Sequence, residues 1–392
     1  MFLNKLFSTG FAILAQKIIL TEFILMKRRY KILNGIAIFF VLLFTVLGFT
    51  LSYTADCEPT TETAEQADSM QAIVASCYGA PEVLELLTVT KPIPVDNEIL
   101  VKVDAASVNP ADWHRMRGSP YIMRLMTGIA VPKSDKVGTD FSGVVEAVGK
   151  DVTMFKVGDA VFGGRSGAYA VYLTMPENRA VALKPANITH EQAAAVPMAA
   201  LTALQAVRDK GLVQAGHKVL INGASGGVGT KAVQIAKALG AEVTGDNSTR
   251  NVEMVLSIGA DYVIDYKKDD FTIQDIKYDV ILDMAGNHSF SKILNALKPD
   301  GRLVTVGGEK GDWIAPLIKP IGTIFMQPFV DQQLIGFIAS LNQDDLKDLA
   351  ELMRDGNLNA VIDRQYSLAQ TADAMAHSET GRARGKIIVN MQ

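Results

Sequence analysis

The sequence predicts an α/β protein whose body combines a small antiparallel β-barrel with a doubly wound parallel sheet, preceded by one transmembrane helix. Three observations predict this architecture. A long uncharged apolar run lies near the N-terminus. Short strands separated by Gly, Pro and Asp turns follow it, and beyond about residue 190 apolar strands alternate with helical stretches. The 392 residues are also too many for one compact core, which favours two domains.

The apolar run covers residues 32–53, ILNGIAIFFVLLFTVLGFTLSY, and its 22 residues are enough to cross roughly 30 Å of hydrocarbon as a helix. A secretory signal would have a shorter apolar run and a small-residue cleavage site, and a soluble core helix would carry residues polar enough to face solvent. We therefore expect a single-pass membrane anchor at 32–53, after a basic segment at 1–31. Residues 54–69 are acidic and threonine-rich, which is typical of a flexible tether.

Four basic residues stand just before the anchor, namely Lys27, Arg28, Arg29 and Lys31. The positive-inside rule then favours a cytoplasmic N-terminus and a body, residues 54–392, on the far side of the membrane. Because Met26 directly precedes these bases, we expect the functional protein to begin there. The upstream run FAILAQKIIL then has no role, and the alternative is that it forms a second helix on the membrane surface.

Composition excludes several classes of protein. Hydrophobic residues make up 48% and charged residues 20%, which is typical of a globular chain. The net charge of −4 is spread without a basic stripe, so we expect no nucleic-acid partner. Cys57 and Cys77 are too few for a disulfide framework or a four-cysteine zinc lobe. A single disulfide between them is one alternative, and two free thiols are the expectation.

The barrel is expected over residues 70–192, where QAIVAS, EILVKVDAASV, GVVEAVG, DAVFG and AYAVYL recur as short strands. The segment 328–392 returns to mixed elements and ends in GKIIVNM, a further predicted strand. We expect it to cross back and complete the barrel domain. The parallel sheet is expected over 193–327, with the strands VLING, AEVTG, DYVID, DVILDM and RLVTVG.

The first strand of the parallel sheet runs directly into a glycine-rich loop and a helix, in VLINGASGGVGTKAVQIAK. A dinucleotide site needs glycines at such a turn, so that the backbone can approach the pyrophosphate and the helix N-terminus can offer free N–H groups. Ala224 stands at the first glycine position of this fingerprint, and Gly226 and Gly229 at the second and third. The loop therefore predicts a Rossmann-type dinucleotide site formed by Ala224, Ser225, Gly226, Gly227, Val228 and Gly229.

The end of the second strand favours NADPH over NADH. An NAD site usually carries an acid there for the ribose hydroxyls, whereas this chain has Asn247 followed by Ser248, Thr249 and Arg250. A cation and two hydroxyls can hold a 2′-phosphate through charge-assisted hydrogen bonds. Strand alternation should turn Asp246 away from this site. Capping of a helix by Ser248 or Thr249 is a compatible alternative.

From about residue 70 to the end, the chain resembles the medium-chain dehydrogenase/reductase superfamily, specifically its zinc-free quinone oxidoreductase branch, similar to zeta-crystallin. The segments that carry the resemblance, in the family's order, are ASVNPADWHRMRG, VGTDFSGVVEAVG, FKVGDAVFG, AAALTALQAV, GHKVLINGASGGVGTKAVQIAK and STRN. The resemblance implies a GroES-like barrel domain, a Rossmann domain, and a cofactor in the cleft between them. Zinc-dependent relatives hold a cysteine and a Gly-His-Glu where this chain has Asn109, Thr139 and Asp140, so no catalytic zinc is expected.

The resemblance further implies hydride transfer from NADPH to a quinone or an α,β-unsaturated carbonyl compound. Asn109 could then hydrogen-bond the developing oxyanion and Asp112 could orient the site. The structural alternatives are that Asn109 caps the turn at Pro110, and that Asp112 pairs with Arg115 or Arg117. Further cofactor contacts implied by the resemblance come from Thr202 near the nicotinamide, Asn287 toward the ribose, Val306 and Gly307 at the end of the fifth strand, and Lys386 toward a phosphate.

Two other functions are alternatives to the reductase: a metal-free alcohol dehydrogenase-like enzyme, and a non-catalytic dinucleotide-binding scaffold at a membrane. The stretch 313–340 is largely apolar but is interrupted by three prolines and by charged residues, so it is not expected to span a membrane. Ordinary core packing is the expectation for it. A wall of the substrate site, or a subunit contact in a homodimer, is the alternative.

Overall fold

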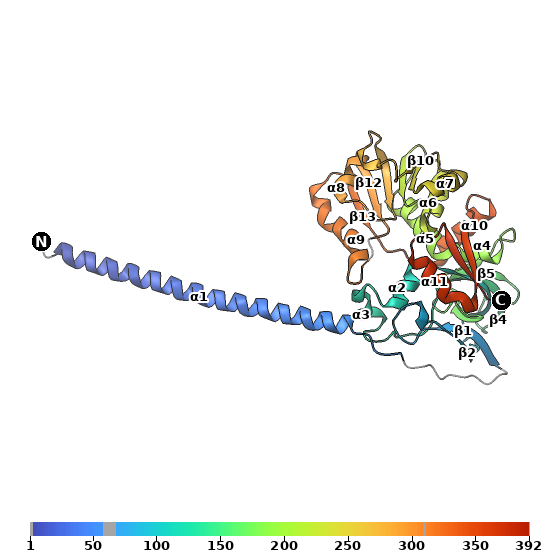
Figure 1. The fold of residues 1–392 in the computed structure, drawn as a ribbon, viewed down its shortest axis with the longest axis horizontal. Helices are drawn as coiled ribbons and strands as arrows, with labels where there is room; N and C mark the ends of the chain where they lie inside the picture. The colour runs from blue at the N-terminus through green and yellow to red at the C-terminus, as the bar shows by residue number, and fades with distance from the viewer. Residues whose placement is uncertain (1–2, 58–67, 309–310, 392) are drawn as a thin grey trace. The chain divides into compact units, whose positions relative to one another are not determined.

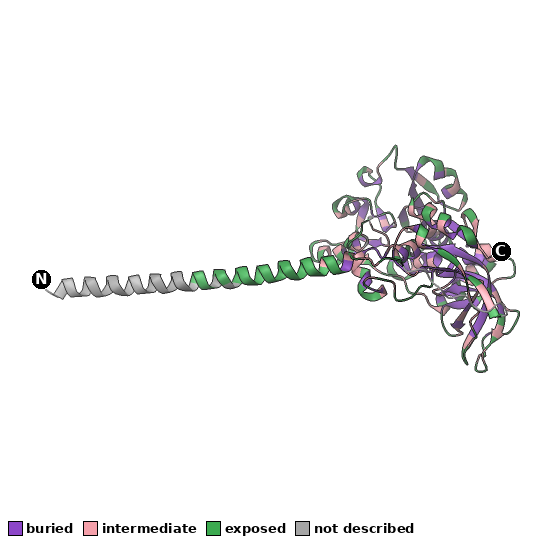
Figure 2. Ribbon diagram, turned by 60° about the horizontal axis from the view of Figure 1, so that its bottom comes forward, coloured by how far each residue is buried: buried purple, intermediate pink, exposed green. Residues whose placement is uncertain are grey.

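The computed structural model describes residues 3–57, 68–308 and 311–391, which form two compact units, Met1–Tyr53 and Thr54–Gln392. The first unit is the single helix α1 (Leu3–Ser52), which contains both the basic cluster and the predicted anchor. By length and composition, its segment Met26–Ser52 could cross a membrane, and it is the one such helix among the described residues. Most described side chains of α1 are exposed, whereas the strands of the second unit are largely buried (Figure 2).

The second unit, which we call the body, begins with a seven-stranded, mainly antiparallel sheet that packs around a core of its own (Figure 1). The strand order is β14-β15-β3-β4-β5-β7, and β6 also pairs with β3. Ile388 of β15 is the partner of Ser107 in β3, so the last strand of the chain joins this sheet. The strands are β3 (Glu98–Val108), β4 (Asp140–Val148), β5 (Ala160–Gly164), β6 (Tyr172–Pro176), β7 (Val181–Leu183), β14 (Ile362–Ser367) and β15 (Lys386–Asn390), beside a separate pair, β1 (Ser69–Val74) and β2 (Glu85–Thr90).

The rest of the body is built on a six-stranded parallel sheet of order β10-β9-β8-β11-β12-β13. Successive residues of β8 enter different core clusters, Leu220 on one face and Val219 and Ile221 on the other, because both faces are covered by helices. The strand order reverses between β8 and β11, which is where such sheets bind ligands. The predicted α/β fold is confirmed, and β13 adds a sixth strand to the five expected. The strands are β8 (Lys218–Asn222), β9 (Glu242–Asn247), β10 (Tyr262–Asp265), β11 (Tyr278–Asp283), β12 (Leu297–Thr305) and β13 (Gln333–Gly336).

The helices of the body divide between the two sheets. Around the parallel sheet lie α5 (Pro197–Leu204), its π-helical continuation η4 (Gln205–Lys210), α6 (Gly227–Ala238), η5 (Thr249–Asn251), α7 (Val252–Ser257), η6 (Phe271–Ile273), α8 (Phe290–Ala296), α9 (Ala315–Met326) and η7 (Gln327–Phe329). The others are η2 (Pro81–Val83), α2 (Pro110–Arg117), η3 (Tyr121–Met123), α3 (Arg124–Thr127), α4 (His190–Ala194), α10 (Gln343–Arg354), η8 (Leu368–Gln370) and α11 (Thr371–Glu379).

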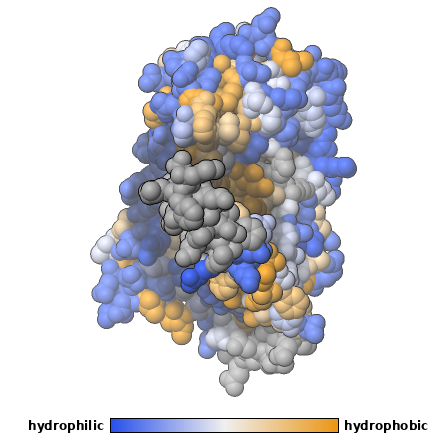
Figure 3. All heavy atoms as spheres, turned by 90° about the vertical axis from the view of Figure 1, so that its left-hand side faces the viewer, coloured by the Kyte–Doolittle hydropathy of each residue, from blue (hydrophilic) through white to orange (hydrophobic). Residues whose placement is uncertain are grey.

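The expectation of core packing is wrong for much of the stretch 313–340. Leu334 in β13 is buried in the sheet, but Ile324 and Phe325 of α9 are 71% and 70% exposed. On the face shown in Figure 3, hydrophobic residues (orange) form separate patches among hydrophilic ones (blue). The topology accounts for this exposure, because β13 is the edge strand of the parallel sheet and α9 packs beside it.

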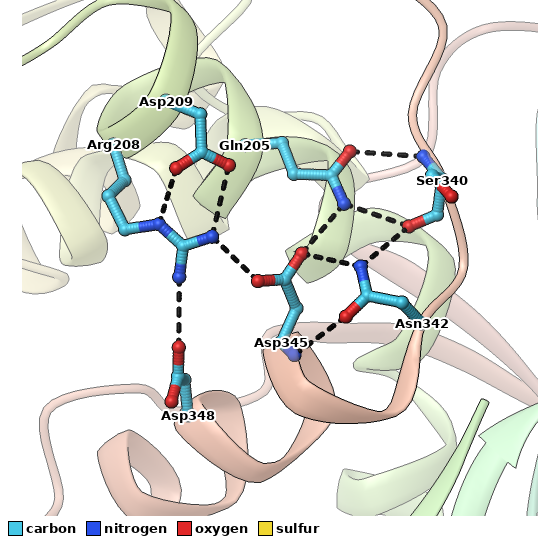
Figure 4. Close-up of polar contacts among 7 residues, drawn as sticks. All are labelled: Gln205, Arg208, Asp209, Ser340, Asn342, Asp345 and Asp348. Atoms are coloured by element: carbon cyan, nitrogen blue, oxygen red, sulfur yellow. Dashed lines mark hydrogen bonds and ion pairs between the residues drawn. The ribbon is translucent and has the colours of Figure 1, made fainter. Parts of the chain in front are cut away.

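A polar network ties η4, which follows α5, to α10 (Figure 4). Arg208 donates to Asp345 at 2.6 Å and to Asp348 at 2.9 Å, and Gln205 donates to the carbonyl of Ser340 at 2.8 Å. Arg208 also bonds the adjacent Asp209, and this hydrogen bond makes the largest contribution to raising the pKa of Arg208. The network fixes the return segment of the chain onto the parallel-sheet part of the body.

Cys57 and Cys77 form a disulfide with a Cα–Cα distance of 5.2 Å, which corrects the expectation of free thiols. The predicted tether is also not free at its start, because Thr54 accepts a hydrogen bond from Arg124 at 3.0 Å and the Ala55 amide donates to the Ala130 carbonyl at 3.2 Å. These contacts hold residues 54–57 on the body and bring Cys57 to Cys77. The rest of the tether, 58–67, lies outside the described residues.

Candidate functional site

The loop between β8 and α6 makes a close turn that only glycine allows at two positions. Gly223 has a φ of +90°, in the left-handed region that favours glycine, so it makes the turn that sequence reasoning assigned to Ala224. Ala224 is instead fully buried in the core. A Cβ atom on Gly229 would lie 2.1 Å from the Gly223 carbonyl oxygen, so helix and strand can approach each other only because this residue is glycine.

A cavity of about 310 Å³ lies between this loop and the barrel. One wall is formed by Gly226, Gly227, Val228 and Gly229 at the N-terminus of α6, and the facing wall includes Asn109 and Lys386. The N-terminal turn of a helix leaves backbone N–H groups without partners in the helix, and these favour an anion. The cavity therefore unites the predicted nucleotide loop with the predicted catalytic Asn109.

The start of β15 is held directly against the nucleotide loop. The Gly385 amide donates to the Ser225 carbonyl at 2.9 Å, and Gly385 forms a bridge with Gly226. The stem of Lys386 passes the helix N-terminus, since a Cβ on Gly227 would lie 3.1 Å from its Cδ atom. Sequence reasoning missed Gly385, although its φ of +78° and its place before the strand mark a required turn.

The ammonium of Lys386 turns toward the barrel. It donates to the Asn109 Oδ1 atom at 2.6 Å and to the Val108 carbonyl at 2.8 Å, and it lies 3.5 Å from the Asp140 carboxylate. The Asn109 Nδ2 atom donates to Asp140 at 3.0 Å. Burial lowers the pKa of Lys386 and raises that of Asp140. The predicted phosphate contact of Lys386 stays a prediction, and the observed partners of its ammonium are protein atoms.

Asp112 has a local structural role next to this cluster. Its carboxylate accepts hydrogen bonds from the Asn109 backbone amide at 2.8 Å, from Thr139 at 2.8 Å and from Tyr169 at 3.2 Å. Burial raises its pKa. The suggested pairing with Arg115 or Arg117 is wrong, because these arginines contact Ser166 and Glu379 respectively. Asp112 thus fixes the first turn of α2 and, with it, the position of Asn109.

The end of β9 carries unpartnered polar atoms. Within the described residues, the Oδ1 atoms of Asn247 and Asn251 are buried and have no hydrogen-bond partner. The Asn251 Nδ2 atom donates to the Ser225 hydroxyl at 2.9 Å, so this residue, which sequence reasoning missed, joins the β9 end to the nucleotide loop. Such orphaned acceptors at this end of a sheet fit the hydroxyl groups of a bound nucleotide.

The residues predicted to hold a 2′-phosphate are only partly available. Ser248 begins η5 but makes no side-chain capping bond, and Thr249 donates its hydroxyl to Asp265 at 2.7 Å. Arg250 is exposed and contacts the Arg382 carbonyl. The carboxylate of Asp246 is buried, and within the described residues neither of its oxygens has a hydrogen-bond partner. Burial, with a smaller contribution from nearby carboxylates, raises its pKa to about 7.

The other residues implied by the resemblance stay predictions as cofactor contacts; Asn287, Val306 and Gly307 follow strands β11 and β12, and Thr202 lies in α5. Asn287 accepts a hydrogen bond from Asn222 at 2.8 Å, and the amides of Val306 and Gly307 donate to the Asp283 carbonyl. Thr202 donates to the Met198 carbonyl within α5.

The positions that correspond to zinc ligands in related dehydrogenases are occupied by residues bonded to one another. Asn109 and Asp140 belong to the Lys386 cluster, and Thr139 bonds Asp112. Across the described part of the chain, no group of three or more His, Cys, Asp or Glu residues could hold a metal ion. His114 contacts the Ser119 carbonyl at 2.7 Å through its Nδ1 atom.

Two family models match the body: an alcohol dehydrogenase GroES-like domain over residues 95–185, and a zinc-binding dehydrogenase domain over residues 258–389. A chloroplast envelope quinone oxidoreductase homolog of Arabidopsis thaliana is 33% identical over 336 residues, covering 82% of this chain and 98% of that protein. An NADPH-dependent alkenal/one oxidoreductase of the same plant is 32% identical over 339 residues, which cover 82% of this chain and 79% of that protein. The structure of a quinone oxidoreductase from Coxiella burnetii superposes with a TM-score of 0.74 at 31% identity, covering 83% and 100%.

The fold and these similarities define an oxidoreductase that uses a nicotinamide dinucleotide. The chain belongs to the medium-chain dehydrogenase/reductase superfamily, in its zinc-free quinone oxidoreductase branch, which confirms the resemblance drawn from the sequence.

Proposed function

We propose that this protein transfers a hydride from NADPH to a quinone or to the β-carbon of an α,β-unsaturated carbonyl compound. The observation that carries the proposal is the cavity in which the glycine loop of α6 faces Asn109 and Lys386. The similarity to plant and bacterial quinone oxidoreductases and to an alkenal/one oxidoreductase supports the two acceptor classes.

The residues around the cavity fit a dinucleotide. Gly226 and Gly227 line the cavity at the N-terminus of α6 and carry no side chain, so the backbone there can approach a pyrophosphate. The buried acceptors of Asn247 and Asn251 suit ribose hydroxyls. Arg250, exposed in η5 just beyond β9, would pair with the 2′-phosphate of NADPH. When bound, the cofactor supplies the hydride.

The chain then orients the acceptor and stabilises its negative charge. The Lys386 ammonium donates to the Asn109 Oδ1 atom, and the Asn109 Nδ2 atom donates one of its two hydrogens to Asp140. The second hydrogen on Nδ2 therefore has a fixed direction. We assign this hydrogen to the acceptor oxygen, which gains negative charge as the hydride arrives. One proton from water completes the two-electron reduction, since Asp140 and Lys386 are engaged with each other.

The test is NADPH oxidation by the full chain with a panel of quinones and enones, in the presence of EDTA. We expect turnover with at least one of these classes and no loss of rate on chelation. Turnover of secondary alcohols with NADP⁺ alone would favour the alcohol dehydrogenase-like alternative. Binding of NADPH without turnover of any acceptor would favour a scaffold.

We also propose that α1 anchors the body to a membrane as a single-pass helix, with the body on the far side from the cytoplasm. The basic residues before the apolar run 32–53, which lie within the candidate helix Met26–Ser52, favour this orientation. The Cys57–Cys77 disulfide favours an oxidising compartment for the body. Protease added to sealed, right-side-out vesicles tests this topology.

A further inference from the structure

Large apolar side chains of α3 and α9 are exposed on the body. Met126 is 80% exposed and Leu125 52%, while α9 and its start expose Phe325, Ile324, Ile318 and Trp313 by 70%, 71%, 55% and 49%. A soluble protein rarely leaves so many large apolar side chains together in water, and such a surface usually marks an interaction site.

The two helices form one continuous surface. The Tyr121 amide, just before α3, donates to the Asp312 carbonyl, just before α9, at 2.6 Å. The Tyr121 ring meets the Trp313 ring edge-on, with 5.1 Å between centroids. We call the exposed apolar side chains of Leu125, Met126, Trp313, Ile318, Ile324 and Phe325 the apolar rim.

Both helices turn their only charge inward. Arg124 in α3 is 2% exposed and donates to the Gly118 carbonyl at 2.7 Å, and Lys319 in α9 is 8% exposed and donates to Asp283 at 2.8 Å. The exposed face of the apolar rim therefore carries no charge of its own from these helices. Such a face can enter hydrocarbon without the cost of desolvating an ion.

The chain itself indicates what covers this surface. Thr54 is bonded to Arg124 of α3, and Ala55 is bonded to Ala130 just beyond α3. Only Tyr53 separates Thr54 from Ser52, the last residue of the candidate membrane span. Two residues reach at most about 7 Å, so a span that ends at Ser52 in a bilayer must end beside α3. The Cys57–Cys77 disulfide secures the same segment to the body a second time.

Helix α9, whose exposed face carries part of the apolar rim, reaches the candidate active site through its buried face. Asp283, which binds Lys319 of α9, ends β11, and the two residues that follow it, Met284 and Ala285, line the cavity. A lipid surface that covers α9 would thus adjoin the site where we place the acceptor.

We propose that the apolar rim docks on the lipid bilayer beside the anchor, so that a quinone dissolved in the membrane reaches the cavity without crossing water. The assignment of quinone rests on the proposed function, and the docking rests on the anchor. A second copy of the chain on the same face is the competing occupant. The continuity of the chain from the span to α3 favours lipid, because every anchored copy holds its own apolar rim at the membrane.

Trp313 provides an intrinsic probe of the docking. The chain has two tryptophans, so the full-length Trp113→Phe variant carries Trp313 alone. In phosphatidylcholine vesicles whose acyl chains are brominated near the headgroup, we expect its fluorescence to fall by about half relative to unbrominated vesicles, at any protein-to-lipid ratio. The matched Trp313→Phe variant, which keeps Trp113 in α2, should lose far less. Unquenched Trp313, or crosslinking between copies through the apolar rim, would overturn the proposal.

A charge placed in the apolar rim gives the second test. The Met126→Glu/Phe325→Glu variant should lose most of the Trp313 quenching and reduce a bilayer-embedded long-chain quinone at least about fivefold more slowly. Its rate with a water-soluble quinone should stay within about twofold of wild type. The control is Ile93→Glu, at a site that is 86% exposed in another part of the body, which should behave as wild type in both assays. Equal rates of the double variant and wild type with the embedded quinone would contradict docking. Quenching of Trp313 without any quinone turnover would instead overturn the proposed function and leave the docking intact.

Discussion

The Lys386 ammonium donates a hydrogen bond to the Asn109 Oδ1 atom at 2.6 Å, although 277 residues separate the two in the sequence. Lys386 begins β15, and Asn109 directly follows β3 as the N-cap residue of α2. The return of the chain to the barrel therefore sets the orientation of the amide that faces the cavity. The first two predictions follow from this pair.

Substitution of Asn109 should impair chemistry more than cofactor binding. We expect Asn109→Ala to lower kcat by about 10²-fold, because it removes a donor to the developing oxyanion, and to change the KM for NADPH by less than about threefold. Steady-state kinetics with a water-soluble quinone measure both. The control is Ser166→Ala, at a surface partner of Arg115, which should match wild type. An unchanged kcat for Asn109→Ala would remove this residue from the reaction.

Removal of the Lys386 charge should destabilise the fold. Lys386→Met leaves the fully buried Asp140 carboxylate without its cation, and breaking such a pair costs about 3–5 kcal/mol. Urea unfolding at pH 7 should show the loss, and Lys386→Met/Asp140→Asn should recover a large part of it. A double variant as unstable as the single one would mean that Lys386 stabilises through packing rather than through charge.

Cofactor preference should depend on Arg250. We expect wild type to prefer NADPH to NADH, and Arg250→Ala to raise the KM for NADPH about tenfold or more while that for NADH stays nearly constant. The matched control is Arg354→Ala, an exposed arginine at the end of α10. Equal KM values for the two cofactors in wild type would show that Asn247 and Arg250 do not select the 2′-phosphate.

Much of the fold followed from sequence because its signals are local. Strand–helix alternation and the glycine loop depend on spacing alone, and five of the six parallel strands were predicted in this way. The barrel-completing strand followed from its apolar pattern and the family resemblance. Gly223 was overlooked in favour of Ala224 because the fingerprint fixes a spacing, whereas the turn depends on a φ value that the sequence does not state.

The parts that escaped prediction depend on distant contacts. The bond of the Lys386 ammonium to Asn109, the partners of Asp112 and the contact of Asn251 with Ser225 each arise where segments far apart in sequence meet. Cys57 and Cys77 looked like unpaired thiols because no pattern indicated that residues 54–57 would bind α3 and its loop. The apolarity of α9 suggested a core helix, since hydrophobicity cannot distinguish a buried face from one that meets a partner.

The stability of the protein should fall as pH rises through the range of Asp246. Burial first, and neighbouring carboxylates second, raise its folded pKa to about 7, whereas an unfolded aspartate titrates near 3.9. Between these values the folded state holds a proton that the unfolded state has lost, so stability decreases from about pH 4 up to about pH 7. Asp246→Asn should remove this slope and raise Tm at pH 8 by roughly 3–8 °C. A steeper fall of Tm with pH in the variant would contradict the assignment.

The topology of the body brings two lines of argument into conflict. The bases before residues 32–53 and the Cys57–Cys77 disulfide both favour a body on the far side of the membrane, in an oxidising compartment. An NADPH-dependent enzyme, however, needs a supply of reduced cofactor, which bacterial exteriors generally lack. The charge bias acts while the helix inserts and is independent of what the folded body later needs, so we expect it to prevail.

Protease added to sealed, right-side-out vesicles should then digest the body, and maleimide should label Cys57 and Cys77 only after a reductant is added. Full protection of the body until the vesicles are opened, with both thiols labelled at once on opening, would place it in the cytoplasm and show that the charge bias is overcome.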